Sequence, residues 1–248
     1  GLHRSYAFTR GFDALSWAEM TLGYMLWILG YPDQGMAHVE KSVTWAREIN
    51  HPNTTSLALF YVVMLSQQRG DRERVLEVTT EILEMDKRFG LPAQAAYSGV
   101  MRRWVARDLD NLRGTLAYME QAGFGLGLSY YRSLIPELLA ERGEHKEALA
   151  ELGAILQWSR ETGELYWVAE NLRFQGVCRF AINEADHEAA EALFREALDT
   201  ARAQSSRLHE LRTAVSYARM LKRLGRVDDA REVLGPVVGW FTEGSTWG

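Results

Sequence analysis

The sequence repeats one local pattern six times: an apolar helix-forming stretch, a short polar turn and a second helical stretch that opens on a small residue. The six turns lie at residues 30–35, 70–74, 108–111, 143–148, 183–190 and 225–230. Their spacing of about 35–42 residues is the period at which helix-turn-helix units stack into solenoids. Such units bury their cores only against neighbouring units and leave a long surface free for a partner. The pattern therefore predicts a binding scaffold and indicates no reaction.

Between the turns, apolar residues recur at helical spacing, as in the series Leu15, Ala18, Leu22, Leu26 and Leu29. No segment shows a sustained alternation of strand formers, so we predict an all-α chain of about twelve helices. The predicted repeat units span residues 13–51, 52–90, 91–123, 125–164, 165–206 and 207–243. They follow an N-terminal extension, residues 1–12, and precede a tail, residues 244–248.

Prolines mark several of the predicted helix boundaries. Pro32, Pro52 and Pro92 lie at turns or helix starts, where a fixed φ and a missing N–H are tolerated. Pro136 falls in a stretch that otherwise reads as helix interior, and there we expect a kink or a helix that begins nearby. Asn53 matches a glycosylation acceptor, but we interpret it as the cap of the helix that begins there.

Composition excludes several classes of protein. The chain of 248 residues is 47% hydrophobic and 25% charged, as in ordinary folded proteins. Its formal net charge of −5 argues against direct binding to nucleic acid, which needs a basic face. No apolar stretch approaches the about 20 residues of a membrane helix, and no secretory signal is visible. The single cysteine, Cys178, lies in an apolar run and is expected to be a buried thiol, so we predict a cytoplasmic protein.

The residue patterns of known catalytic and metal sites are missing. The six histidines are scattered along the chain, at most two to a unit, and no two have the spacing of metal ligands. His51 precedes Pro52 at a helix boundary, where a capping role suffices. Neither a Walker A motif nor a Gly-Xaa-Ser-Xaa-Gly elbow is present. We therefore expect no catalytic residue, cofactor or metal in these 248 residues.

Small residues recur where the two helices of a unit meet. The pairs are Gly23 with Gly35, Pro136 with Ala148, and Ala218 with Ala230. Their twelve-residue offset resembles the tetratricopeptide repeat (TPR), which has a small residue in each helix at this offset. The resemblance implies a right-handed α-α superhelix, a TPR-like solenoid of about six helix pairs.

A narrower resemblance covers nearly the whole chain. It rests on Leu-Trp-Ile-Leu-Gly-Tyr-Pro-Asp-Gln at 26–34, Ile-Asn-His-Pro at 49–52, the helix at 211–221 and Trp-Phe-Thr-Glu-Gly at 240–244. These segments resemble the carboxy-terminal repeats of large bacterial signalling proteins. In that family an adenylate/guanylate cyclase or DNA-binding domain precedes an AAA/STAND-type ATPase module and then the repeats. The resemblance implies a regulatory sensor or docking segment, with any cyclase or nucleotide-binding residues upstream of it.

In a stacked repeat the first helix of each pair lines the concave side, and its inward positions can be counted from the small residues. The predicted partner-binding set is Trp17, Met20, Tyr24, Trp27, Phe60, Met64, Tyr97, Trp104, Tyr130, Glu137, Arg173, Arg212 and Arg219. Ser133, Glu170 and Lys222 fall on the same face. Aromatic and arginine side chains dominate interface energies, and the set predicts a peptide with an apolar part and an acidic part. Against this, a single aromatic residue at helical spacing is more often core.

Other functions remain open from the sequence. The repeats could bind a small molecule in an aromatic-lined pocket and pass its occupancy to an upstream enzyme. They could also serve as the effector-binding domain of a transcriptional regulator. A third possibility is self-association into a homodimer, because the ends of a solenoid need polar caps and the tail carries Trp240, Phe241 and Trp247.

Overall fold

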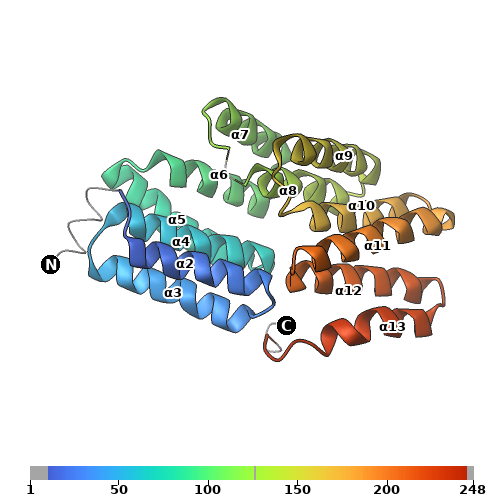
Figure 1. The fold of residues 1–248 in the computed structure, drawn as a ribbon. Coiled ribbons are helices and arrows are strands. Elements are labelled where there is room, and N and C mark those ends of the chain that lie inside the picture. The colour runs from blue at the N-terminus through green and yellow to red at the C-terminus, as the bar shows by residue number, and fades with distance from the viewer. Residues whose placement is uncertain (1–10, 126, 245–248) are drawn as a thin grey trace. The chain divides into compact units, whose positions relative to one another are not determined.

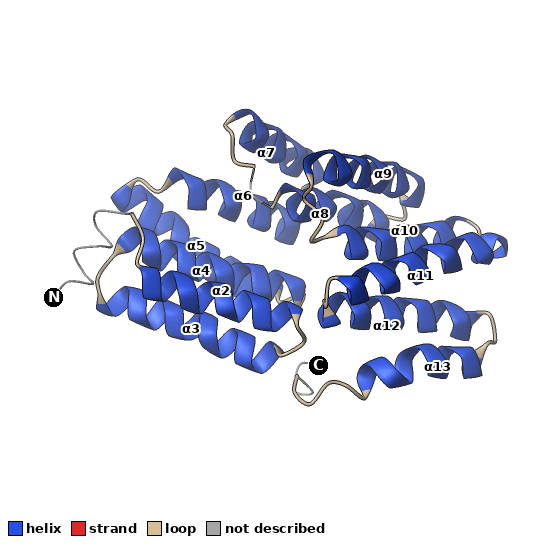
Figure 2. Ribbon diagram, viewed as in Figure 1, coloured by secondary structure: helices blue, strands red, loops and turns tan. Residues whose placement is uncertain are grey.

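A computed structural model describes residues 11–125 and 127–244. Within these residues all regular structure is helical (Figure 2). Most of the predicted extension (1–12) and tail (244–248) lies outside the described residues. The chain divides into two compact units, Gly1–Trp27 with Tyr31–Phe124, and Ile28–Gly30 with Gly125–Gly248.

The first unit consists of antiparallel helices joined by short turns (Figure 1). They are α2 (Ala14–Ile28), α3 (Pro32–Glu48), α4 (Pro52–Gln68), α5 (Arg72–Phe89), α6 (Pro92–Ala106) and α7 (Leu109–Gln121). Neighbours in sequence pack side by side, and α4 also packs against α6, the first helix of the next pair. This is the contact pattern of stacked helical hairpins.

The second unit repeats the arrangement. Its elements are α8 (Leu128–Glu141), α9 (His145–Thr162), α10 (Val168–Ile182), the 3-10 helix η1 (Glu184–Asp186), α11 (His187–Ala203), α12 (Arg207–Arg223) and α13 (Val227–Val238). The first helices α8, α10 and α12 are neighbours, since α10 packs against both of the others. The prediction of an all-α chain built from helix pairs is confirmed for the described residues.

Local sequence signals set the helix starts. Pro32, Pro52 and Pro92 each stand in the first turn of their helix, as predicted. Pro136 lies inside α8, which begins at Leu128, so the expectation of a helix starting near this proline is wrong, and the alternative of a kink stays a prediction. Pro136 is buried in this helix, and that burial offsets the loss of one backbone hydrogen bond.

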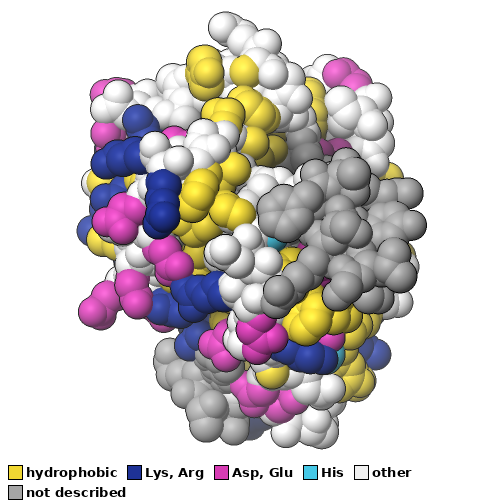
Figure 3. Space-filling view, turned by 90° about the vertical axis from the view of Figure 1, so that its left-hand side faces the viewer, with side chains coloured by type: hydrophobic (Ala, Val, Ile, Leu, Met, Phe, Trp, Pro, Cys, Tyr) yellow, Lys and Arg dark blue, Asp and Glu magenta, His cyan; other side chains and the backbone are white. Residues whose placement is uncertain are grey.

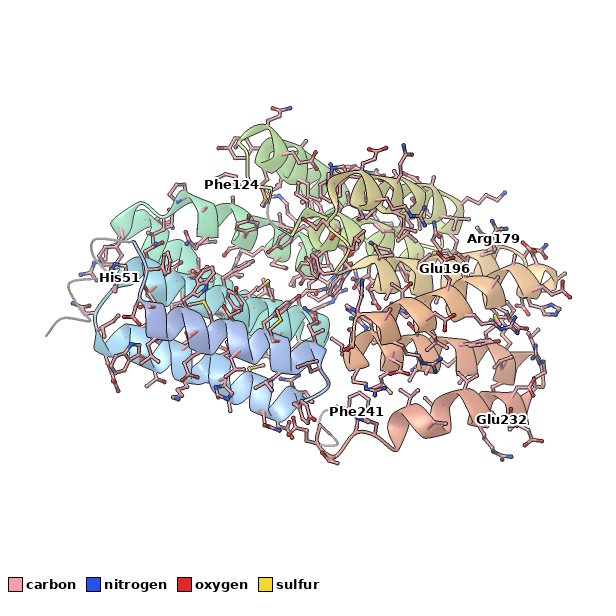
Figure 4. All side chains as sticks on the ribbon, viewed as in Figure 1. His51, Phe124, Arg179, Glu196, Glu232 and Phe241 are labelled. Atoms are coloured by element: carbon pink, nitrogen blue, oxygen red, sulfur yellow. The ribbon has the colours of Figure 1, made fainter. Side chains whose placement is uncertain are left out.

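The cap of α4 is His51 and not Asn53 (Figure 4). The Nδ1 atom of His51 accepts the N–H of Thr54 at 3.3 Å. Asn53 instead donates to the carbonyl oxygen of Gly11 at 2.6 Å. The predicted capping role of Asn53 is therefore wrong, because its side chain lies past the first turn and bonds to the preceding loop, whereas His51 stands at the boundary.

The small-residue pairs are points of close packing between the helices of a pair. A Cβ atom on Gly23 would lie 2.6 Å from the carbonyl oxygen of Gly35, so α2 and α3 meet backbone to backbone. Ala218 and Ala230 are likewise buried between α12 and α13. In the fifth pair a Cβ on Gly176 would meet the ring of Phe194 at 3.0 Å, so an aromatic ring occupies the space beside this glycine.

Candidate functional site

Aromatic side chains connect the first helices of the first unit. The rings of Tyr24 and Tyr61 lie 6.1 Å apart in an edge-to-face contact between α2 and α4. Phe60 lies 5.4 Å from Tyr97, and Tyr97 lies 6.2 Å from Phe124. We call these five residues the aromatic row. Pairs of this kind hold neighbouring helices together beyond their buried area.

Five of the thirteen predicted partner-binding residues are buried in their own unit. They are Met20, Trp27, Phe60, Trp104 and Tyr130. Trp27 donates its indole N–H to Gln68 at 2.8 Å, and Trp104 is covered by the guanidinium of Arg72 at 4.6 Å. The first helices α2, α4 and α8 are each covered by the next first helix as well as by their own partner, so their inward positions become core, whereas Trp104 on α6 is covered from α5. We therefore no longer count these five among the residues open to a partner.

The other aromatic and methionine positions of the predicted set retain accessible surface. Tyr24, Met64 and Tyr97 are half-buried. Trp17 is 39% exposed and lies 5.2 Å from the ring of Phe12. These four side chains could contribute to an apolar contact surface on the first unit.

The second unit contains a buried group of charged side chains on α10 and α12, which we call the ion cluster. Arg173 makes a bidentate pair with Glu170, with Nε to Oε2 at 2.8 Å and Nη2 to Oε1 at 2.7 Å. Its Nη1 atom donates to Ser216 Oγ at 2.9 Å. Arg212 Nη2 lies 3.2 Å from the same Oε1 of Glu170. Two arginines, one on α10 and one on α12, are thus held by the Glu170 carboxylate, and Arg173 is also held by the Ser216 hydroxyl.

The electrostatics of the ion cluster favour the charged forms. Burial opposes ionisation of Glu170, but the charges of Arg173 and Arg212, with the hydrogen bonds from Arg173, hold its pKa well below the usual range. Burial also acts against charged Arg173, and the Glu170 carboxylate outweighs it and raises the pKa. The side chain of Arg212 is 33% exposed, against 8% for Glu170. Arg212 is therefore the member of the cluster that a partner could reach.

His209 lies beside the ion cluster and is fully buried. Its ring meets Trp167 edge to face at 4.7 Å, and neither ring nitrogen has a hydrogen-bond partner. Burial lowers the pKa of His209 to about 4, the nearby Glu170 raises it, and Arg212 and Arg173 lower it. The imidazole is consequently neutral at pH 7, with a donor and an acceptor both unsatisfied.

Aromatic residues close the other side of His209. Trp167 packs against Tyr130 at 4.8 Å and donates its indole N–H to Ser133 Oγ at 3.0 Å. This places α8, α10 and α12 around one buried region that is aromatic on one side and charged on the other.

The sequence placed several of these residues on one face. Glu170, Arg173 and Arg212 come together as an inward-facing set, and Glu137 is half-buried on α8, where its charge acts on Arg173. Arg219 is exposed on α12 and forms no ion pair with any described residue. His209, Ser216 and Trp167 were missed. For Ser216 a signal existed, since it stands four residues after Arg212 on the same helix face.

No group of three or more metal-ligating side chains occurs among the described residues. Cys178 is buried, as predicted, and burial raises the pKa of its thiol to about 11, with Arg173 lowering it slightly. No helix in the described ranges is both long and apolar enough to cross a membrane.

Comparison with known proteins supports the fold and leaves the family open. No family model matches the chain. An uncharacterized protein of Rhizobium meliloti (strain 1021) is 23% identical over 203 residues, which is 79% of this chain and 20% of that protein. The chain therefore spans about one-fifth of the length of this relative.

A solved structure has the same architecture. The crystal structure of the apo form of RapI, a TPR-like helical repeat protein, aligns with a TM-score of 0.64 at 14% identity. The alignment covers 92% of this chain and 84% of RapI. The chain accordingly has an all-α, TPR-like helical repeat fold.

Proposed function

We propose that this chain is a non-catalytic protein-interaction scaffold whose second unit binds an acidic segment of a partner along α12. The observation that carries the proposal is the row of cations on that helix. Arg212, Arg219 and Lys222 lie at seven- and three-residue steps, and Arg219 and Lys222 are exposed. Neither of these two forms an ion pair with a described residue, so both charges are available to a carboxylate.

The ion cluster supports this role by positioning Arg212. Its guanidinium is held by Glu170 on one side while a third of the side chain stays exposed. A cation fixed before binding loses less conformational entropy when a partner arrives. The chain has a net charge of −5, so most of its surface does not attract an acidic partner. A local group of cations therefore directs such a partner to this site.

A screen of an arrayed library of short peptides tests the proposal, and fluorescence anisotropy measures the affinity of each hit. We expect enrichment of Asp- and Glu-rich peptides, affinity that falls with added salt, and a loss of about tenfold or more in R219E/K222E. The matched control is R231E on α13, where Arg231 is 75% exposed. Enrichment of neutral peptides, or equal binding by R219E/K222E and wild type, would contradict the proposal.

The wider role follows from the resemblance to bacterial signalling proteins. We propose that the repeats act as the regulatory or docking segment of a longer cytoplasmic protein that carries a cyclase or ATPase domain. The length of the Rhizobium meliloti relative is compatible with that organisation. The sequence of the complete gene would test it, since a cyclase, ATPase or DNA-binding domain would be read directly.

A second candidate function is the sensing of a small polar molecule in the second unit. The unsatisfied nitrogens of His209, beside the ion cluster and Trp167, favour it, because buried polar groups are normally paired. A thermal-shift screen against a metabolite panel distinguishes the two functions. Sensing predicts a large shift with one compound that disappears in H209Q, whereas peptide binding predicts shifts that depend on Arg219.

A further inference from the structure

Helix α2 exposes an uninterrupted apolar stripe. Leu15 is 44% exposed, Leu22 45%, Met25 47% and Leu29, immediately after the helix, 40%. Ala18 is exposed on the same line. We call these five residues the α2 stripe. Figure 3, which faces the left-hand side of Figure 1, shows hydrophobic side chains together with charged ones on that side. A contiguous exposed apolar surface of this kind marks an interaction site.

Four of the five equivalent positions on α4 are buried, and a helix packs on α4. When Gly23 is matched with Val63 on α4, Leu15, Ala18, Leu22 and Met25 correspond to Thr55, Ala58, Val62 and Leu65, which are all buried. Leu29 corresponds to Arg69, which is exposed. The second helix of the preceding pair, α3, packs on α4. The α2 stripe therefore occupies a helix-docking face of the repeat.

Helix α12 shows how such a face is filled. When Gly23 is matched with Ala218, Leu22 corresponds to Tyr217, whose ring stacks on Phe194 of α11 at 5.4 Å. The Tyr217 hydroxyl also donates to Glu191 of α11 at 2.6 Å. The α2 stripe has no hydroxyl or other polar group that could make a hydrogen bond like that of Tyr217. A helix that docks on the α2 stripe would therefore be held by apolar packing.

The stripe is complementary to itself. Its residues lie at −7, −4, 0, +3 and +7 from Leu22, so an antiparallel second copy related by a twofold axis at Leu22 places Leu15 opposite Leu29. The same axis sets Leu22 against its own symmetry mate and brings the small Ala18 within one residue of the position opposite the large Met25. Large-against-small pairing of this kind is what interdigitated helix packing requires.

Charge does not oppose the pairing. Glu19 is the one charged residue within Ala14–Ile28, and it is turned to α3, where Lys41 and His38 bind its carboxylate at 2.6 Å each. Two α2 helices can thus approach without like charges meeting, which is the condition that a twofold interface imposes.

We propose that the α2 stripe is a homodimer interface in which two copies of this chain pack α2 against α2 in antiparallel orientation about Leu22. The contact spans about 21 Å of helix, from Leu15 to Leu29. A single helix pair is smaller than a standard interface, so the expected dissociation constant is on the order of 10 μM.

Sedimentation velocity over about 1 to 200 μM protein, a range that brackets weak interfaces, tests the proposal. We expect a monomer–dimer equilibrium in the wild type and a dissociation constant raised about tenfold or more by L22E, which sets two carboxylates on the twofold axis. The control is L76E, because Leu76 on α5 is also exposed, at 37%. Circular dichroism verifies that both variants keep their helices.

Disulfide trapping provides an independent readout. Mild oxidation of L22C should give a covalent dimer, while L76C should not, and the native Cys178 is buried. A wild type that stays monomeric throughout the range, or a dimer unaffected by L22E, would overturn the proposal. A monomer would assign the α2 stripe to another helix, of a different polypeptide or of the upstream part of the longer protein proposed above. Peptide binding through Arg219 would be unchanged by either result.

Discussion

Gly23 and Gly35 face each other so closely that neither has room for a side chain. A Cβ atom on Gly23 would lie 2.6 Å from the carbonyl oxygen of Gly35, and a Cβ atom on Gly35 would lie 2.8 Å from the carbonyl oxygen of Gly23. The contact is reciprocal and involves backbone on both sides. Backbone atoms cannot rotate away as the end of a side chain can, so the two glycines set the distance between α2 and α3.

Replacing either glycine should therefore destabilise the first unit despite the better helix propensity of alanine. We expect G23A to lower the free energy of unfolding by about 1–3 kcal/mol through overpacking. The matched control is G114A, because Gly114 is exposed in α7 with open space around its Cα. That change should raise stability by about 0.5–1 kcal/mol. Urea denaturation of the two variants measures both effects, and equal stabilisation by both would refute the close-packing role.

The tryptophans of the predicted binding set should separate into two classes. Trp104 is 1% exposed beneath Arg72, and W104A should lower the free energy of unfolding by about 3–5 kcal/mol. Trp17 is 39% exposed, so W17A should leave helical content and the thermal midpoint near those of the wild type. Thermal unfolding followed by circular dichroism compares them. A stable W104A would show that this side chain is not core.

The repeat fold could be predicted because its signals are local. The spacing of Gly23 and Gly35, and the prolines that open α3, α4 and α6, each act within a single hairpin. Periodicity could not predict which apolar helix faces are covered by another helix. Leu15 and Leu22 follow the same pattern as buried residues elsewhere, yet they are exposed because no described helix covers them.

The candidate site was only partly predictable for a similar reason. Helical phase placed Glu170, Arg173 and Arg212 on one face, and the structure joins them. The burial of His209 depends on Trp167, which lies on a different hairpin, and no pattern within one helix encodes that contact. Likewise, Trp104 and Phe60 carried the composition of a binding surface, but both are buried: Arg72 of α5 covers Trp104, and Phe60 packs against Tyr97 of α6.

Removing the carboxylate at the centre of the ion cluster should be strongly destabilising. E170Q leaves the buried Arg173 and the partly exposed Arg212 near one another without their shared counter-ion, and the expected loss is about 3 kcal/mol. D228N is the control, because it breaks the ion pair of Arg231 with Asp228 at an exposed position and should match the wild type. If chemical denaturation showed that E170Q is as stable as D228N, the ion cluster would not contribute to the free energy of unfolding of the second unit.

The buried imidazole of His209 should make stability depend on pH between 7 and 5. Burial lowers its folded-state pKa to about 4, against 6.5 for the free side chain. As the pH falls through 6.5, the unfolded chain binds a proton that the folded chain refuses, so the free energy of unfolding decreases until the folded pKa is reached. At pH 5 the expected loss relative to pH 7 is about 2 kcal/mol.

The variant H209Q isolates this effect, since glutamine does not titrate. The other groups that face His209 are Glu170, Arg173 and Arg212, and the low pKa of Glu170 confines its own contribution to more acidic solution. Urea denaturation of wild type and H209Q at pH 7 and pH 5 should show the larger decrease in the wild type, whatever the absolute stability of the variant. Identical decreases would mean that His209 is protonated in the folded protein at pH 5. The protonated imidazole would then donate a hydrogen bond to the carboxylate of Glu170 or to solvent.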